Sequence, residues 1–160
     1  MLEKFSEQLH QLASVDEKRS GSLCSRLSDE FQRELLDYDS MPESFFNYFL
    51  TLISVEQYYQ KPGVWQFILA LNTPRDDLSE AQFKQVAGTF VDNFEKYNDG
   101  DLCLAVCDFI ARNMEPIEAT SLLNQLKAKE VTKGEKLRGY ADEGLHIVQQ
   151  EVKRAKLNPK

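Results

Sequence analysis

Two Glu-x-x-His pairs are the residues in this sequence best suited to chemistry. Glu7–His10 and Glu143–His146 have the spacing with which helical bundles hold two metal ions, provided that the motifs point into the core. At about 100° per residue, each pair lies about 140–200° away from the apolar stripe of its own predicted helix. We therefore expect both motifs to face solvent, and the sequence predicts no metal ion and no other cofactor.

The three cysteines, Cys24, Cys103 and Cys107, are the next candidates. Cys103 and Cys107 lie one helical turn apart, but a zinc site needs two further ligands at finger spacing, and the sequence does not supply them. An odd number of cysteines without secretory features also argues against a disulfide framework. We expect buried thiols that pack as small apolar side chains. No catalytic residue is predicted, and neither a P-loop nor a dinucleotide fingerprint is present.

The elements that position these residues are predicted to be helices throughout. Apolar residues recur every three or four positions rather than every second one, which is typical of an all-α protein. Three capping boxes are expected, at Ser40–Glu43, Ser79–Gln82 and Thr132–Glu135, and a polar break is expected over 14–22. The 160 residues are predicted to form a single all-helical domain with a frayed tail at 157–160, and the first helix is a candidate cap of that domain. The expected helices are 2–13, 23–37, 42–60, 64–72, 79–97, 101–113, 116–126 and 132–156.

A helical repeat is suggested by the spacing of these elements. Half-exposed helices begin at Pro42, Ser79 and Pro116, at steps of 37 residues. The buried run Leu102–Ala111, a turn, and then Pro116-Ile-Glu-Ala119 followed by two leucines resembles one unit of the HEAT/armadillo-like repeat superfamily. The resemblance implies a short α-solenoid over about 23–152. An irregular bundle of seven or eight helices makes the same stripes and remains the alternative.

The charge is acidic and unevenly distributed. The formal net charge is −7, with 21 Asp and Glu against 10 Lys and Arg in residues 1–120, and 5 against 9 in residues 121–160. An acidic body repels nucleic acid and favours a basic protein partner. No apolar run is long enough to cross a membrane and no signal peptide is evident, so we expect a cytoplasmic protein that binds no membrane. A basic cluster near the last turn is expected to complement helix dipoles at the surface: Lys127, Lys129, Lys133, Lys136 and Arg138.

Acidic residues gather near helix ends together with aromatic residues, and these groups are the candidate partner-binding surface. In a solenoid, equivalent turns stack along one edge, so repeated acidic turns would form a negative ridge with tyrosine anchors. A plain solvated acidic surface is the alternative. The candidate residues are Asp29, Glu30, Glu34, Asp37, Tyr38 and Asp39 in a first group, Asp76, Asp77 and Glu80 in a second, and Asp92, Glu95, Tyr97, Asp99 and Asp101 in a third.

The function that this surface favours is non-catalytic binding of a basic protein. Its sharpest form is an inhibitor that resembles, as a class, the immunity proteins that neutralise basic, nuclease-like bacterial toxins. A helical-repeat adaptor that binds a peptide or helix in its groove is one alternative. A metal-dependent helical-bundle enzyme is a more remote one. The sequence leaves the identity of the partner and the oligomeric state open.

Overall fold

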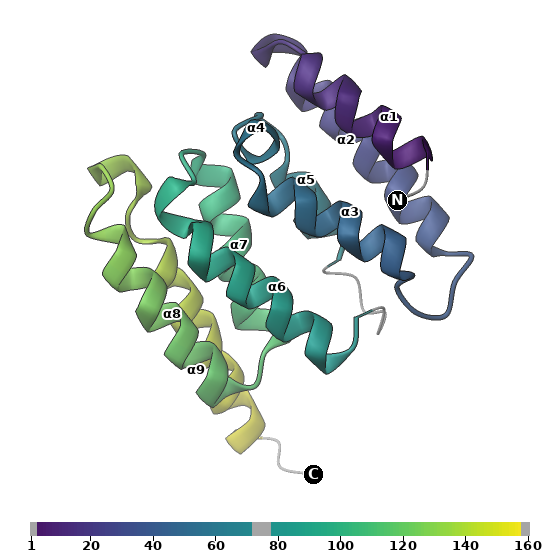
Figure 1. Ribbon diagram of the computed structural model, residues 1–160. Helices are drawn as coiled ribbons and strands as arrows, with labels where there is room; N and C mark the ends of the chain where they lie inside the picture. The colour runs from purple at the N-terminus through teal and green to yellow at the C-terminus, as the bar shows by residue number, and fades with distance from the viewer. Residues whose placement is uncertain (1–2, 72–77, 158–160) are drawn as a thin grey trace. The chain divides into compact units, whose positions relative to one another are not determined.

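The computed structural model describes residues 3–71 and 78–157 of the chain. Every regular element in these ranges is a helix, which confirms the all-α expectation (Figure 1). No helix in the described part of the chain is both long and apolar enough to span a membrane. The internal contacts divide the chain into two compact units, Met1–Asn93 and Phe94–Lys160, and each is described below by itself.

The first unit is built around a cluster of buried aromatic rings. Phe5 stacks on Tyr48 with ring centroids 4.4 Å apart, and Phe45 meets Phe5 edge-on at 4.9 Å. Phe31 and Phe67, from two further helices, contact each other and the ring of Tyr48. Such pairs stabilise a core by about 0.5–1.5 kcal/mol each beyond the burial of their area. The helices of this unit are α1 (Glu3–Ser14), α2 (Glu17–Leu35), α3 (Glu43–Ser54), α4 (Glu56–Tyr59), α5 (Trp65–Ala70) and α6 (Glu80–Asn93).

The predicted break over 14–22 is present but too long, because only Val15 and Asp16 separate α1 from α2, which already begins at Glu17. The Asp16 carboxylate caps the helix by accepting a hydrogen bond from the backbone N–H of Arg19 at 3.0 Å. Gly21 then lies inside the helix, where the turn at Gly63 packs closely on it. A Cβ at Gly63 would lie 3.0 Å from the Gly21 Cα, and Gly63 has a φ of +100°. Ser20 in the same stretch donates its hydroxyl to the Pro62 carbonyl at 2.8 Å, so α2 contacts the turn before Gly63 here.

Two of the predicted capping boxes lie in the first unit, and one of them is confirmed. At the start of α6, the Gln82 backbone N–H donates to Ser79 Oγ at 3.1 Å, and Ser79 N–H donates to Gln82 Oε1 at 2.9 Å. The box at Ser40 is wrong, because Pro42 is the N-cap of α3 and makes no side-chain cap. The helix predicted to continue to Gln60 also ends early, since Val55 is extended and separates α3 from α4.

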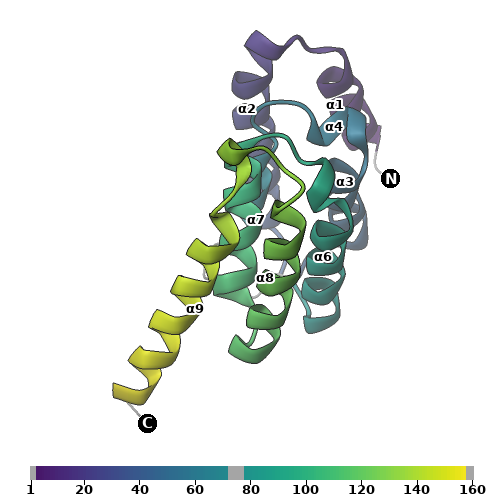
Figure 2. The ribbon, with the colours of Figure 1, turned by 90° about the vertical axis from the view of Figure 1, so that its left-hand side faces the viewer.

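The second unit is a three-helix arrangement in which α7 packs against both α8 and α9 (Figure 2). Its α7 is buried on most sides, as the sequence predicts. Gly144 brings α9 close to its neighbours: a Cβ there would lie 2.8 Å from Leu123 Cδ2 and 3.3 Å from the Cys107 carbonyl oxygen. The elements are η1 (Phe94–Lys96), α7 (Gly100–Asn113), α8 (Pro116–Glu130), η2 (Glu135–Leu137) and α9 (Tyr140–Leu157).

The last helix begins at Tyr140, so the predicted box at Thr132 and Glu135 is wrong. Thr132 Oγ instead donates back to the Lys129 carbonyl at 2.7 Å. The start of α9 is capped by Glu130, from the end of the preceding helix. Its carboxylate accepts hydrogen bonds from Gly139 N–H at 3.0 Å and from Ala141 N–H at 2.8 Å. Gly139, predicted inside the helix, precedes it with a φ of +98°.

Candidate protein-binding surface

The acidic surplus of the chain lies entirely in the first unit. Residues 1–93 contain 15 Asp and Glu against 8 Lys and Arg, a formal net charge of −7. Residues 94–160 contain 11 of each sign and are formally neutral. A basic partner that is attracted by the net charge is therefore attracted by the first unit.

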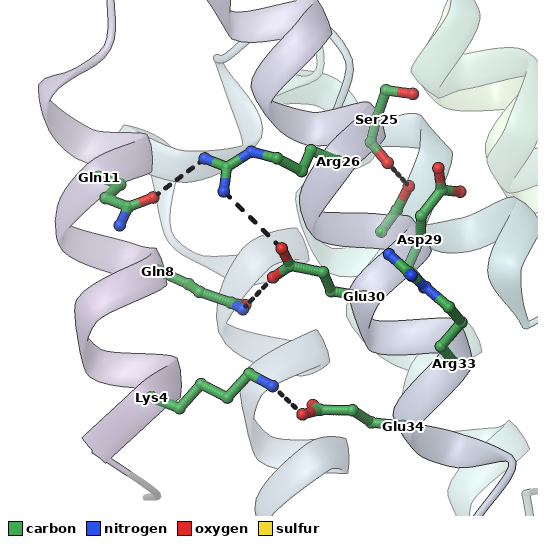
Figure 3. Close-up of polar contacts among 10 residues, drawn as sticks. Lys4, Gln8, Gln11, Ser25, Arg26, Asp29, Glu30, Arg33 and Glu34 are labelled. Carbon is green, nitrogen blue, oxygen red and sulfur yellow. Dashed lines mark hydrogen bonds and ion pairs between the residues drawn. The ribbon is translucent and has the colours of Figure 1, made fainter.

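Two candidate carboxylates of the first group face α1 (Figure 3). Glu30 Oε2 accepts a hydrogen bond from Gln8 Nε2 at 3.2 Å, and its other oxygen lies 3.7 Å from Arg26. Glu34 forms an ion pair with Lys4. These contacts join α1 to α2 and partly neutralise both carboxylates. Glu30 and Glu34 are therefore already engaged in contacts within the unit and are less available to a partner.

Asp29 lies on another side of α2 and lines a hollow shared with α5. The hollow has a volume of about 220 Å³, and the half-buried Trp65 and the exposed Leu69 line it as well. A carboxylate attracts a lysine or arginine side chain by its charge, and an indole ring attracts it by a cation–π interaction. The hollow is therefore chemically suited to a cationic side chain of another protein.

The segment that follows α2 presents apolar side chains between uncompensated carboxylates. Leu36 is 63% exposed and Tyr38 45% exposed, and the neighbouring Asp37 and Asp39 are exposed as well. The ring of Tyr38 rests edge-on against Phe45 at 5.3 Å, which fixes its direction. Among the described residues, no cation forms an ion pair with Asp37 or Asp39. The residues 36–39 are called the acidic segment below.

The second predicted group is only partly described. Asp76 and Asp77 lie outside the described residues. Glu80 is exposed in the first turn of α6, and its carboxylate lies 3.6 Å from Lys84 Nζ. Asp92 of the third group is exposed near the end of the same helix. Nothing in the described chain joins these residues to the acidic segment as one surface.

The remaining residues of the third group belong to the second unit and have mainly structural contacts. Tyr97 is buried, so its prediction as an exposed partner anchor is wrong. Asp99 is the N-cap of α7, and its carboxylate accepts a hydrogen bond from the N–H of Asp101 at 2.9 Å. Glu95 lies 3.6 Å from Lys129. Of these four residues, only Asp101 is both exposed and without an ion pair to another described residue.

The Glu-x-x-His pairs and the cysteines, the other candidates for chemistry, are also described by the structure. Glu7, His10, Glu143 and His146 are all exposed, as the helical geometry predicts. Within the described ranges no three or more His, Cys, Asp or Glu residues gather as metal ligands. All three thiols are buried, and desolvation raises the pKa of Cys24 and that of Cys103 to about 11. Thiols with so high a pKa are poor nucleophiles near neutral pH.

Lys133 is a buried charged residue that the sequence does not reveal. Lys133 was expected at the surface, but it is only 6% exposed. Its ammonium donates to the Tyr97 carbonyl at 2.6 Å and to the Glu95 carbonyl at 3.3 Å, and it lies 5.1 Å from the ring centre of Phe94. Burial lowers the pKa of the Lys133 ammonium. The residue satisfies carbonyl groups at the end of η1, and no local pattern in the sequence distinguishes it from its exposed neighbours.

Comparison with known proteins gives no relative. No family model, no curated protein and no solved structure matches this chain.

Proposed function

We propose that this protein is a non-catalytic binding protein that holds a basic protein through its first unit. The observation that carries the proposal is the acidic segment, where Leu36 and Tyr38 stand exposed between the uncompensated carboxylates of Asp37 and Asp39. Exposed apolar and aromatic side chains supply interface energy, while unpaired charges speed the association of an oppositely charged partner.

The hollow beside Asp29 supports the same proposal. A lysine or arginine that enters between the carboxylate and the Trp65 ring gains a charge contact and a cation–π contact at once. Because the net charge of −7 belongs to this unit, the long-range field and the local contacts favour the same class of partner.

The sharpest form of the proposal is an inhibitor, an immunity protein that neutralises a basic, nuclease-like bacterial toxin. Such toxins bind polyanions, so an acidic, helical protein can occupy the same cationic surface.

The HEAT-like repeat also remains a proposal. It is supported by the starts of α3, α6 and α8, at Glu43, Glu80 and Pro116, which follow one another at steps of 37 and 36 residues.

The test is to identify the partner and then to perturb the acidic segment. The immobilised full chain captures proteins from an extract of its source cells, and those bound at low salt are identified by mass spectrometry. We expect a basic protein whose association rate falls steeply as salt is added. The double variant Asp37→Lys/Asp39→Lys should slow its association by about tenfold or more at low salt.

A matched variant separates a local surface from the overall charge. Glu135→Lys/Glu143→Lys changes the net charge by the same amount but alters only exposed carboxylates of the second unit. We expect this variant to keep most of the wild-type association rate. The proposal is wrong if both variants slow association equally, or if the proteins captured are acidic and insensitive to salt.

A further inference from the structure

The second unit carries an apolar groove that no residue of this unit fills within the described range 94–157. It lies between the first turns of α8 and the C-terminal half of α9, and its volume is about 530 Å³. Pro116, Ile117 and Thr120 form one wall, and Val148 and Val152 form the floor and the other wall. Val148 is almost fully buried, whereas Ile117 is 90% exposed. The two helices contact each other, and Figure 2 shows that α9 diverges from α8 toward its C-terminal end.

The exposure of Ile117 is unusual because it coincides with a concave surface. A single exposed apolar side chain is common and needs no explanation. Here, however, the isoleucine stands at the edge of a groove whose other linings include two valines and a proline. Contiguous apolar surface in a concave site is typical of places where another protein docks.

Two lysines give the groove its electrostatic character. Lys153 and Lys156 line it from α9, and both are exposed. In the described part of the chain neither forms an ion pair. The nearest acidic residue of the same helix turn, Glu151, lies 3.6 Å from Arg154 and lines the adjoining hollow rather than this groove. The wall of the groove is therefore apolar at its base and positive at its rim.

We propose that this groove binds an amphipathic helix of a partner protein, one that carries acidic residues beside its apolar stripe. The stripe covers Ile117 and Val152, and the acidic residues meet Lys153 and Lys156. From Val148 to Lys156 the groove follows two turns of α9, about 12 Å, which matches two to three turns of a bound helix. Docking of an apolar helix face into a groove between two helices is a common mode of peptide recognition.

This surface is distinct from the acidic segment in position and in charge. The acidic segment belongs to the first unit and favours a basic partner, whereas the groove belongs to the neutral second unit and has a basic rim. One chain can therefore hold two partners of opposite charge. The proposal does not depend on the acidic segment, so the variant Asp37→Lys/Asp39→Lys should bind a helix in the groove as the wild type does.

The test uses a labelled synthetic peptide of about 18 residues, with leucines at i, i+3, i+4 and i+7 and glutamates beside them. Fluorescence anisotropy measures its affinity for the full chain. A scrambled peptide of the same composition and a peptide with lysine in place of glutamate are measured alongside. We expect the acidic amphipathic peptide to bind at least about tenfold more tightly than either, since only this peptide combines both features. Methyl NMR spectra should show shifts at Ile117, Val148 and Val152.

Two pairs of variants locate the site. Ile117→Glu should weaken binding of the acidic peptide by about tenfold or more. Val131→Glu, which places the same charge on the exposed apolar residue that directly follows α8, should not. A glutamate in the first turn of α8 also suits the helix dipole, so the fold is kept. Lys153→Glu/Lys156→Glu should reverse the preference toward the lysine peptide. The exposed pair Lys96→Glu/Lys136→Glu, matched in charge, should not.

Several results would overturn the proposal. These are the absence of binding at millimolar peptide, equal binding of the scrambled peptide, an unchanged affinity in Ile117→Glu, or methyl shifts elsewhere. Concentration-dependent sedimentation that Ile117→Glu abolishes would identify a second copy of the chain as the occupant, and would also overturn it.

Discussion

Replacing Lys133 by methionine should destabilise the second unit substantially. Methionine keeps most of the volume and the apolar stem of the lysine but removes the ammonium. The carbonyl groups of Tyr97 and Glu95 then lose a donor at 2.6 Å and one at 3.3 Å, and the ring of Phe94 loses its cation. Because Lys133 is buried, water cannot readily take the place of the ammonium.

The size of the effect follows from opposing contributions. Hydrogen bonds to a charged group stabilise a fold by about 1.5–3 kcal/mol each, and buried carbonyl groups left without a partner cost a similar amount. The lowered pKa of Lys133 shows that burial of its charge is itself unfavourable, so part of this loss is recovered. We expect a net loss of about 2–3 kcal/mol in the free energy of unfolding, larger than the effect of a typical surface substitution.

Amide hydrogen exchange in α7 reports the stability of the second unit, and the fluorescence of Trp65, the single tryptophan, reports the first unit during urea unfolding. A loss of about 2–3 kcal/mol lowers the protection of slowly exchanging α7 amides by roughly 30–150-fold. Lys136→Met is the matched control, because Lys136 is exposed, and it should change the stability by less than about 0.5 kcal/mol. If Lys133→Met is as stable as this control, the carbonyl contacts do not hold the unit together and the reasoning fails.

Further predictions concern the glycines and the thiols. Gly144→Ala should destabilise the chain by about 1–2 kcal/mol, because the added Cβ would lie 2.8 Å from Leu123 Cδ2. In Gly88→Ala, in α6, the added Cβ has no neighbour within 4 Å, so this variant should stabilise the chain by about 0.5–1 kcal/mol. Thermal unfolding measures both changes. The buried thiols should react with a disulfide reagent at pH 8 only after urea unfolding. The folded-state pKa of Cys24 and Cys103, about 11, lies above the value in the unfolded chain, so the native state holds more protons between about pH 9 and 11. Urea unfolding at several pH values should therefore show stability falling over that window, by up to about 1.4 kcal/mol per pH unit for each thiol.

Elements whose signals are local could be predicted from the sequence. The box of Ser79 and Gln82 forms as expected, because both partners lie within one turn and need no other part of the chain. The buried helix α7 was recognisable because apolar residues surround it on nearly every side. The close approach at Gly144 follows the same local rule, since a glycine inside a helix is unfavourable unless a neighbour needs the space.

Elements that depend on distant residues could not be predicted in this way. The stretch before Leu23 looks like a break by composition, yet α2 runs through it, where Ser20 donates to the Pro62 carbonyl at 2.8 Å and the turn at Gly63 packs on Gly21. The start of α9 was placed at a local capping signal near Thr132. The cap that forms comes from Glu130 and reaches over the intervening turn to Gly139 and Ala141. A capping box competes with such non-local partners, and sequence spacing alone does not show which one prevails.

The candidate surface also depends on distant residues. A count of carboxylates in the sequence does not show which of them already pair with a cation of the same chain. Glu34 already pairs with Lys4, and an exposed ion pair contributes at most about 1 kcal/mol. A partner cation that displaces Lys4 exchanges one such pair for another and gains almost nothing. Asp37 and Asp39 have no ion pair with any residue that the structure describes, so each new contact there adds to the attraction. The affinity for a basic partner should accordingly depend on the acidic segment far more than on the larger number of carboxylates along α2.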